Sequence, residues 1–544
     1  MTGPENRSPA GAKPRPLPIR WWPALVTLLV AATATIWIRV VTELNQQERT
    51  LGSAVTGLTT GLVLLLWWVG FSRARVRLRL VVLGSVVGAA LAVAVLFHLR
   101  GVTGDLLPVL EWRWSSATGA AGAGVLANPA PSGAERARLL AGVRDYPQFL
   151  GPRRNATLTG ARLAHDWQAQ PPRQLWRQRV GAAWSGFAVA GRLAVTQEQQ
   201  GDDEAVVAYD LLSGQRLWTH ADHAHYHTTI AGEGPRATPT ITDGRVYTLG
   251  ATGRLNCLDL QTGRVVWTKD IVTDNQSHVN EWGMSGSPLV LDGLVVVSAG
   301  GPQDRSLVAY AAATGKFVWG GGNDGAGYSS PCVATLAGVR QILIFTPGSL
   351  DAHDPRMGRV LWSYPWPRGN PHVAIPVMLP GDRVLVSSGY GVGSEVLQVT
   401  RAADGRFTTK RVWRSIRLKA KFTNVVARDG YIYGLDDGVM VCLDAATGEL
   451  KWKEGRYGHG QEILLDDVLL VTTEDGQVVM LEPTPAGHRE LTRFRVFNDK
   501  TWNPPALAGA YLLMRNDLEA ACYRLPLAAP NPGRLTENRL RSGS

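Results

Sequence analysis

The chain has 544 residues, of which 45% are apolar and 19% are charged. It is too long for one ordinary domain and apolar enough to bury a large core. The formal net charge of +11 is uneven, because residues 1–100 hold 11 Lys and Arg against 3 Asp and Glu. The rest of the chain is nearly neutral, which argues against the basic face of a nucleic-acid-binding domain, so we expect no nucleic-acid partner.

Three apolar stretches follow a basic tail at residues 1–20, and they cover residues 21–38, 54–71 and 80–97. Each has 18 residues without a charged side chain, close to the length that a bilayer-spanning helix needs. A single stretch could belong to a signal peptide. Three in a row, with no small-residue cleavage pattern after the first, predict retained helices. Residues 21–100 are therefore expected to form a three-helix transmembrane anchor rather than buried core helices.

Lys and Arg flank these helices unequally. The N-terminal tail and the second loop carry Arg7, Lys13, Arg15, Arg20, Arg73, Arg75, Arg77 and Arg79. The first loop and the residues after the third helix carry Arg39, Arg49, Arg100 and Arg113. Because positive charge stays inside, we expect a cytoplasmic N-terminus in a bacterial inner membrane, with the C-terminal part in the periplasm. Residues 101–144, rich in Ala, Gly and Pro, are expected to be a linker.

A self-similar unit repeats over the remaining chain. Its clearest copies are YDLLSGQRLW (209–218), LDLQTGRVVW (258–267), YAAATGKFVW (310–319) and CLDAATGELKW (442–452), with weaker copies at HDPRMGRVLW (353–362) and QVTRAADGRFTTKRVW (398–413). Apolar residues alternate on both sides of the Thr-Gly centre, which is the period of a half-buried strand. The Gly suits a tight turn, because it tolerates a positive φ. Each copy consists of two strands around its turn. Two further strands, joined by a turn of their own, precede it, so the unit has four strands.

Each unit ends in an aromatic residue that can dock on a neighbouring unit. These positions are Trp176, Trp218, Trp267, Trp319, Trp362, Trp413 and Trp452, with Phe494 in the eighth place. They lie 39 to 52 residues apart, as in propeller blades of four strands. The strand at 173–180 has no partner strands before it, and the last unit lacks its fourth strand. The sequence therefore predicts an all-β, eight-bladed propeller whose ring is closed by the N-terminal strand, rather than an open solenoid.

The motif Asp-x-x-Thr-Gly-x-x-x-Trp resembles the tryptophan-docking motif of pyrroloquinoline-quinone (PQQ)-like propellers. That superfamily includes quinoprotein alcohol and glucose dehydrogenases and the non-catalytic lipoprotein B of the outer-membrane barrel-assembly machinery. The stretch DYPQFLGPRRNATLTG (145–160) is similar to a lead-in segment of PQQ-like propeller proteins from environmental bacteria. The resemblance covers residues 145–525 and leaves a tail at 526–544. It implies the fold but does not decide the function.

In a propeller, the connections between blades share one face with the turns between the second and third strands of each blade. Aromatic and charged side chains in these segments are the candidate ligand-binding positions, for either a protein or a small polar ligand. They are Trp184, Glu233, Arg236, Trp282, Tyr328, His372, Asn424, His459, Glu462, Trp502 and Asn503, with Ser185, and with Asp436 and Asp437 in one turn. The alternative is that these side chains only begin the inner strands and fill the channel.

The resemblance also implies an enzymatic alternative, a PQQ-dependent alcohol or sugar dehydrogenase that passes electrons to membrane quinone. PQQ would stack on a tryptophan of this face, Arg236 would pair with a cofactor carboxylate, and an Asp would act as the base. Glu462 and Asn503 are the candidate calcium ligands. Against this, the chain lacks the adjacent Cys-Cys pair of the alcohol dehydrogenases and any Cys-x-x-Cys-His haem site. The membrane-bound glucose dehydrogenase has five membrane helices where three are expected here.

Two further patterns concern cysteine and histidine. Cys257, Cys332, Cys442 and Cys522 fall in blades that are not sequential neighbours, so we expect buried thiols rather than disulfides. In HADHAHYH, His223, His225 and His227 share one face of an extended segment, a spacing that can bind zinc, copper or nickel. A solvated loop with scattered histidines is the simpler interpretation, so no metal site is assigned.

These patterns together favour a membrane-anchored periplasmic propeller that acts as a non-catalytic binding or scaffolding module, with no catalytic residue. The dehydrogenase, with PQQ and calcium, is the competing class. Recognition of a cell-wall or polysaccharide ligand by the aromatic residues is a third interpretation.

Overall fold

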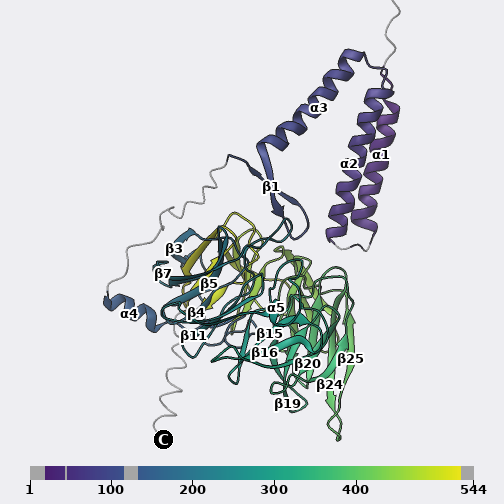
Figure 1. The fold of residues 1–544 in the computed structure, drawn as a ribbon. Helices are drawn as coiled ribbons and strands as arrows, with labels where there is room; N and C mark the ends of the chain where they lie inside the picture. The colour runs from purple at the N-terminus through teal and green to yellow at the C-terminus, as the bar shows by residue number, and fades with distance from the viewer. Residues whose placement is uncertain (1–18, 43, 45, 115–132, 529–544) are drawn as a thin grey trace, which may run out of the picture. The chain divides into compact units, whose positions relative to one another are not determined.

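The computed structural model describes residues 19–42, 44, 46–114 and 133–528 of the chain (Figure 1). The chain divides into two compact units, Met1–Thr118 and Gly119–Ser544. The first unit contains three long helices and a hairpin, and the second contains the repeated strands.

The three helices of the first unit are α1 (Trp22–Ile36), α2 (Gln46–Gly70) and α3 (Val76–Leu96), and α1 continues into a π-helical turn, η1 (Trp37–Val41). With η1 included, they have 20, 25 and 21 residues, and each is long and apolar enough to cross a bilayer. Most of their apolar side chains are exposed, as a lipid-facing surface requires. The prediction of three apolar helices at the N-terminal end is confirmed.

The linker expected over residues 101–144 contains ordered structure at both ends. At its start, β1 (Phe97–Val102) pairs with β2 (Pro108–Trp112), and the rings of Phe97 and Trp112 meet edge to face at 5.3 Å. Alternating apolar residues form the cross-strand pairs of this hairpin. The overall Ala- and Gly-rich composition of the segment does not indicate such pairs, so the hairpin was not predicted. At the other end, α4 (Gly133–Ala141) belongs to the second unit, where the Leu139 carbonyl accepts a hydrogen bond from Tyr511 at 3.0 Å.

The second unit is an eight-bladed propeller, as predicted, and each blade is an antiparallel sheet of four strands. Blades one to four are β4 (Ala188–Ala190), β5 (Leu193–Gln200), β6 (Asp203–Asp210) and β7 (Arg216–His223); β10 (Thr240–Thr242), β11 (Arg245–Leu249), β12 (Arg254–Asp259) and β13 (Val265–Asp270); β14 (Leu289–Leu291), β15 (Leu294–Gly301), β16 (Arg305–Ala311) and β17 (Phe317–Gly321); and β18 (Cys332–Leu336), β19 (Val339–Phe345), β20 (Ser349–His353) and β21 (Val360–Pro365).

Blades five to seven are β22 (Val377–Leu379), β23 (Arg383–Ser388), β24 (Gly393–Arg401) and β25 (Phe407–Ser415); β26 (Val426–Arg428), β27 (Tyr431–Asp436), β28 (Val439–Asp444) and β29 (Leu450–Arg456); and β30 (Gln461–Leu464), β31 (Leu469–Thr472), β32 (Gln477–Leu481) and β33 (Glu490–Arg495). Between blades lie the short helix α5 (Ile271–Asp274) and a small hairpin of β8 (His227–Thr228) and β9 (Gly232–Glu233). First strands of neighbouring blades contact one another, as β4 does with β10, so the first strands surround the axis.

The eighth blade closes the ring. Its first three strands are β34 (Ala506–Ala508), β35 (Tyr511–Arg515) and β36 (Glu519–Arg524), and its fourth is β3 (Arg173–Arg179) from the other end of the repeat region. β3 and β36 are antiparallel, with Trp176 opposite Cys522. The buried Arg515 strengthens this closure, because its guanidinium donates to the Gln197 carbonyl of blade one at 2.8 Å.

The repeated tryptophan contacts the turn of the next blade. The indole N–H of Trp176 donates to the Leu211 carbonyl at 2.8 Å, and that of Trp267 donates to the Ala312 carbonyl at 2.8 Å. A Cβ atom at Gly214 would lie 2.7 Å from the Trp176 ring, and Gly214 has a φ of +71°. The motif therefore needs Gly twice over, for the turn and for the close approach of the ring. Trp218, Trp319, Trp413 and Trp452 donate to the next blade in the same way, at 2.8 to 3.2 Å.

Trp362 and Phe494 depart from this pattern. Blade five has no Asp-x-x-Thr-Gly turn to receive Trp362, and its indole donates to Gln341 of its own blade at 2.7 Å. Phe494 has no indole N–H, and its ring packs on Trp167 and Tyr523, with centroids 5.2 and 5.1 Å away. All four cysteines are buried and unpaired.

The segment 145–160 runs across the first strands of several blades. The Pro147 carbonyl accepts from Ile241 N–H of blade two at 2.7 Å, and Leu158 N–H donates to Leu464 of blade seven at 2.9 Å. Between them, the buried Arg154 donates to the Ser287 and Pro288 carbonyls of blade three, at 2.8 and 2.9 Å. Its ends also bond to turns between first and second strands, where Asp145 accepts from Gly191 N–H. The segment thus covers one end of the axis.

The fully buried Trp176 lies where the ring closes, whereas the equivalent Trp452 is partly exposed. We expect Trp176→Ala to lower the free energy of unfolding by about 3–5 kcal/mol and Trp452→Ala by less, because the first change leaves the larger cavity. Urea denaturation of the full chain in mild detergent measures both. An equal or smaller loss for Trp176→Ala would contradict a closed ring held at this seam.

Candidate functional site

The connections between blades bring equivalent residues to one face of the propeller, which we call the loop face. A residue four positions before the first strand recurs in seven blades. These residues are Trp184, Arg236, Ser285, Tyr328, Val373, Phe422 and Trp502. In blade seven, His459 lies two positions before β30. Because the first strands surround the axis, the seven side chains start from equivalent places around it, and four of these seven are aromatic.

Four of these rings form a continuous aromatic cluster, made of Trp184, Phe422, His459 and Trp502. The Trp502 centroid lies 4.9 Å from that of Trp184 and 4.9 Å from that of Phe422. Phe422 in turn lies 4.9 Å from His459. The cluster joins blades one, eight, six and seven, so residues more than 300 positions apart in the sequence form one aromatic surface.

Hydrogen bonds fix these rings in place. The Trp502 indole donates to Glu474 Oε1 at 2.9 Å, and the other oxygen of the same carboxylate accepts from the His459 backbone at 3.1 Å. The Trp184 indole donates to the Ala231 carbonyl, next to β9. Glu474 therefore orients one side of the cluster and the β8–β9 hairpin orients the other.

A second group of side chains lies around Arg236. Its guanidinium stacks over Tyr226 at 4.6 Å, and its Nε donates to the Trp282 carbonyl at 3.0 Å. The Trp282 and Tyr328 rings are 5.5 Å apart. Burial lowers the pKa of Arg236 to about 10, so it stays protonated at neutral pH. Its donors hold backbone carbonyls, and only its Nη1 lacks a hydrogen-bond partner among the described residues.

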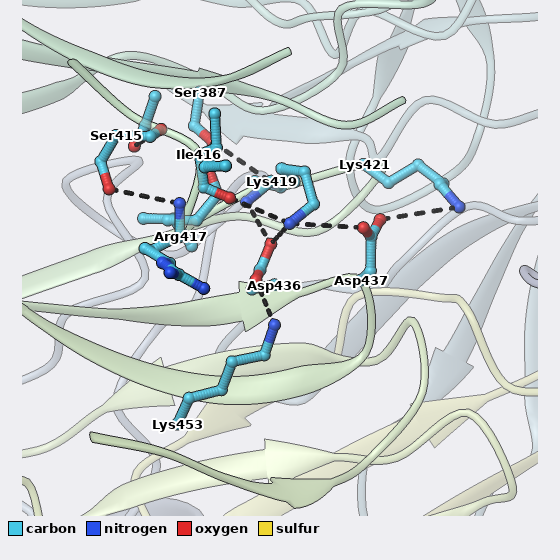
Figure 2. A network of polar contacts seen from close by, with 12 residues as sticks. Ser387, Ser415, Ile416, Arg417, Lys419, Lys421, Asp436, Asp437 and Lys453 are labelled. Carbon is cyan, nitrogen blue, oxygen red and sulfur yellow. Dashed lines mark hydrogen bonds and ion pairs between the residues drawn. The ribbon is translucent and has the colours of Figure 1, made fainter. Parts of the chain in front are cut away.

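A network of lysines and aspartates connects blades five and six at the loop face, and Figure 2 shows three ammonium groups pointing toward two carboxylates. Lys419 and Lys453 both contact Asp436, and Lys419 also lies 3.5 Å from Asp437. Lys421, which is 1% exposed, lies 4.0 Å from Asp437. Asp436 is equally buried. Buried charges need such pairing, so the network primarily fixes the β25–β26 connection.

A set of side-chain hydrogen bonds links neighbouring blades just before the first strands. Its members are Gly186 N–H to Thr238 Oγ1 at 3.1 Å, Thr238 N–H to Ser287 Oγ at 2.9 Å, Ser287 N–H to Ser330 Oγ at 2.9 Å, Ile375 N–H to Asn424 Oδ1 at 3.1 Å and Asn503 Nδ2 to Ser185 O at 2.8 Å. The amides of Asn424 and Asn503 are therefore used in holding blades together.

The structure brings only part of the predicted set together. Trp184, His459 and Trp502 join the aromatic cluster, and Arg236, Trp282 and Tyr328 form the second group. His372 is buried, stacks on Phe345 at 4.4 Å and bonds to the Thr346 carbonyl at 2.7 Å. Glu233 pairs with His225 on the hairpin at 3.0 Å. Sequence reasoning missed Phe422, Lys421, Lys500 and Glu474, although Phe422 could have been found by its position four residues before β26.

The histidine-rich stretch is divided among separate contacts with carboxylate side chains. His223 lies 3.1 Å from Asp203, and His225 lies between Glu233 and Asp202. His220 faces Asp222 at 3.4 Å. In the part of the chain that the structure describes, no group of three or more His, Cys, Asp or Glu side chains is arranged to hold a metal ion. His223 and His225 thus each lie beside carboxylates of their own.

The residues do not fit the calcium and quinone arrangement either. Glu462 lies between blades six and seven, 1% exposed, and burial raises its pKa well above the ordinary value, which the Leu435 backbone amide only partly offsets. Asn503 lies between blades eight and one, where its amide donates to Ala183 and Ser185. The two proposed ligands thus serve different blade interfaces. Two residues at different blade interfaces, one of them a buried carboxyl whose pKa is raised, make a poor calcium site.

Comparison with known proteins assigns the chain to a family. A sequence profile described as outer membrane protein assembly factor BamB matches residues 202–454 and 397–543, more than half of the chain. This chain belongs to that family. The resemblance to PQQ-like propellers drawn from the repeat is thereby confirmed.

Relatives of two kinds match the chain. BamB of Burkholderia pseudomallei is 25% identical over 324 residues, which cover 49% of this chain and 80% of the relative. The quinohemoprotein alcohol dehydrogenase ADH-IIG of Pseudomonas putida is 27% identical over 221 residues, 37% of this chain. The chain spans only 28% of the length of that dehydrogenase. The solved quinohemoprotein alcohol dehydrogenase of Comamonas testosteroni covers 74% of this chain and 83% of its own, with a TM-score of 0.50 and 13% identity, and so shares the fold.

Glu462 makes stability depend on pH. The folded chain keeps a proton on this carboxyl that the unfolded chain releases above its ordinary pKa of about 4.3. The free energy of unfolding should therefore fall as the pH rises from this value. We expect Glu462→Gln to be more stable than the wild type at pH 8, with a difference that shrinks toward pH 4. Denaturant titrations at several pH values test this, with exposed Glu449→Gln as the control; a less stable Glu462→Gln at pH 8 would contradict it.

Proposed function

We propose that this chain is a membrane-anchored, non-catalytic binding and scaffolding module whose loop face holds a protein or a small polar ligand. The observation that carries the proposal is the aromatic cluster that four blades build at the loop face, in which Phe422 and Trp502 are partly exposed, with charged groups beside it. Aromatic side chains with a few oriented polar groups are typical of binding surfaces. Kinship with a protein named as an assembly factor supports a protein partner.

The charges around the helices support the proposed location. Arg20 comes just before α1, and Arg73, Arg75, Arg77 and Arg79 lie at the α2–α3 connection, whereas Arg39 and Arg49 lie on the opposite side of α1 and α2. This distribution supports a cytoplasmic N-terminus in a bacterial inner membrane. The propeller, residues 145–525, would then face the periplasm and present its loop face to partners there.

A PQQ-dependent dehydrogenase is the second candidate, because the chain is similar to a quinohemoprotein alcohol dehydrogenase. The disposition of Glu462 and Asn503 speaks against it. We expect calorimetric titration of the full chain in detergent with PQQ and calcium to show no one-to-one binding, with calcium alone as the control. Saturable binding that Trp184→Ala abolishes would favour the dehydrogenase instead.

The binding role itself is tested by site-specific crosslinking in native membranes. A photoreactive amino acid replaces Trp282, which is partly exposed at the loop face, and in a control replaces Val265, 47% exposed on the outer strand β13. We expect discrete adducts from position 282, identified by mass spectrometry, and none from position 265, because the partner sits on the loop face. The same adducts from both positions, or none from either, would contradict the proposal.

A further inference from the structure

The aromatic cluster already holds a cation of its own chain. The ammonium of Lys500 lies 4.2 Å from the ring centroid of Trp502 and 4.9 Å from that of Trp184. The other cations recorded over a ring among the described residues, such as Arg305 on Phe317, each contact one ring. Lys500 comes from the connection that leads from β33 to β34. Two indole faces therefore meet at one ammonium group.

The surroundings of this ammonium are suited to positive charge. The face of an indole ring carries partial negative charge and attracts ammonium and guanidinium groups. The Glu474 carboxylate is held beside the rings by the Trp502 indole and the His459 backbone, at 2.9 and 3.1 Å. An anion would meet this carboxylate and the electron-rich ring faces. The chemistry of the cluster thus selects for a cation.

The rings do not depend on Lys500 for their positions. Trp184 is held by the Ala231 carbonyl and Trp502 by Glu474. Phe422 packs against both Trp502 and His459. Lys500 reaches the cluster on a long unbranched stem, and its side chain is partly exposed. A pre-formed arrangement of rings would therefore remain if the ammonium moved away, which is the condition for exchanging one cation for another.

We propose that the cluster of Trp184, Phe422, His459 and Trp502, with Glu474, is a binding site for an organic cation, an alkylammonium or guanidinium group, and that Lys500 fills it as an internal ligand. This inference rests on the proposed function, because it names the chemistry of the group that the loop face receives. The cation comes either from a lysine or arginine of a partner protein or from a small amine. Binding displaces Lys500 from the two rings.

The probe for the site is tetramethylammonium. Its binding to the full chain in neutral detergent is measured by saturation-transfer NMR, with sodium chloride at equal ionic strength as the reference. Lys500→Gln removes the internal cation and nearly keeps the length of the side chain. We expect this variant to bind the probe about tenfold more tightly than the wild type, since the site no longer has a competitor. The matched control is Lys451→Gln on the outer strand β29, which should bind as the wild type does.

Two second-site variants keep the result interpretable. In the Lys500→Gln background, Trp502→Ala should abolish binding, and Glu474→Gln, which retains a hydrogen-bond acceptor for the indole, should weaken it severalfold. Urea denaturation shows whether each variant is folded. If Lys500→Gln gains no affinity over Lys451→Gln, or if Glu474→Gln binds as well as its parent, the cation site is overturned.

The photocrosslink at position 282 distinguishes a partner's side chain from a small amine as the source of the cation. It also distinguishes failure of the cation site from failure of the proposed binding function. Adducts that tetramethylammonium suppresses, and sodium does not, identify a partner's lysine or arginine as the cation. Adducts that persist while the probe binds tightly identify a small amine. Failure of Lys500→Gln to bind the probe overturns the cation site whatever the crosslink shows. Absence of adducts alone counts against the proposed function and leaves the probe measurement to decide the site.

Discussion

The contact between a tryptophan and the turn of the next blade holds this propeller together. In most blades the indole covers a glycine of the following turn and donates to a carbonyl beside it, as Trp176 does at Leu211. A single blade has two faces to bury and cannot do so alone. Each contact covers part of one such face, so the blades are stable only as a complete ring. β3 completes that ring by joining the last blade from the other end of the repeat region.

This outer set of contacts has an inner counterpart. Near the axis, hydrogen bonds that involve Thr238, Ser287, Ser330, Asn424 and Asn503 link several blades to their neighbours. The segment 145–160 also bonds to first strands at one end of the axis. Side chains near the axis thus form two groups. One group makes hydrogen bonds between neighbouring blades, and the other lies at the loop face. The aromatic cluster and the residues around Arg236 belong to the second group, whose partly exposed members include Arg236, Trp282, Tyr328, Phe422 and Trp502.

Membership in a family with both assembly factors and dehydrogenases leaves function to the individual site. Here Glu462 lies between blades six and seven and Asn503 between blades eight and one, and this separation speaks against a shared calcium site. Lys421 lies 4.0 Å from Asp437 in a buried network of three lysines and two aspartates. On the loop face Phe422, Trp502 and Trp282 remain partly exposed, and aromatic side chains are enriched at binding surfaces.

The sequence alone determined the number of blades, the position of the closing strand and the three apolar helices. These features depend on residues close together in the chain: a period of two in a strand, a glycine in a turn, an uninterrupted apolar run. The tertiary structure alone decided which loop residues meet. Lys500 and Trp184 share a contact although 316 positions separate them, and Asn503 reaches a carbonyl 318 residues away. No local pattern encodes such pairs, because they arise only when the ring closes. The same limit explains why residues 97–112 were read as part of an anchor and a linker, since their hairpin depends on cross-strand partners that composition does not reveal.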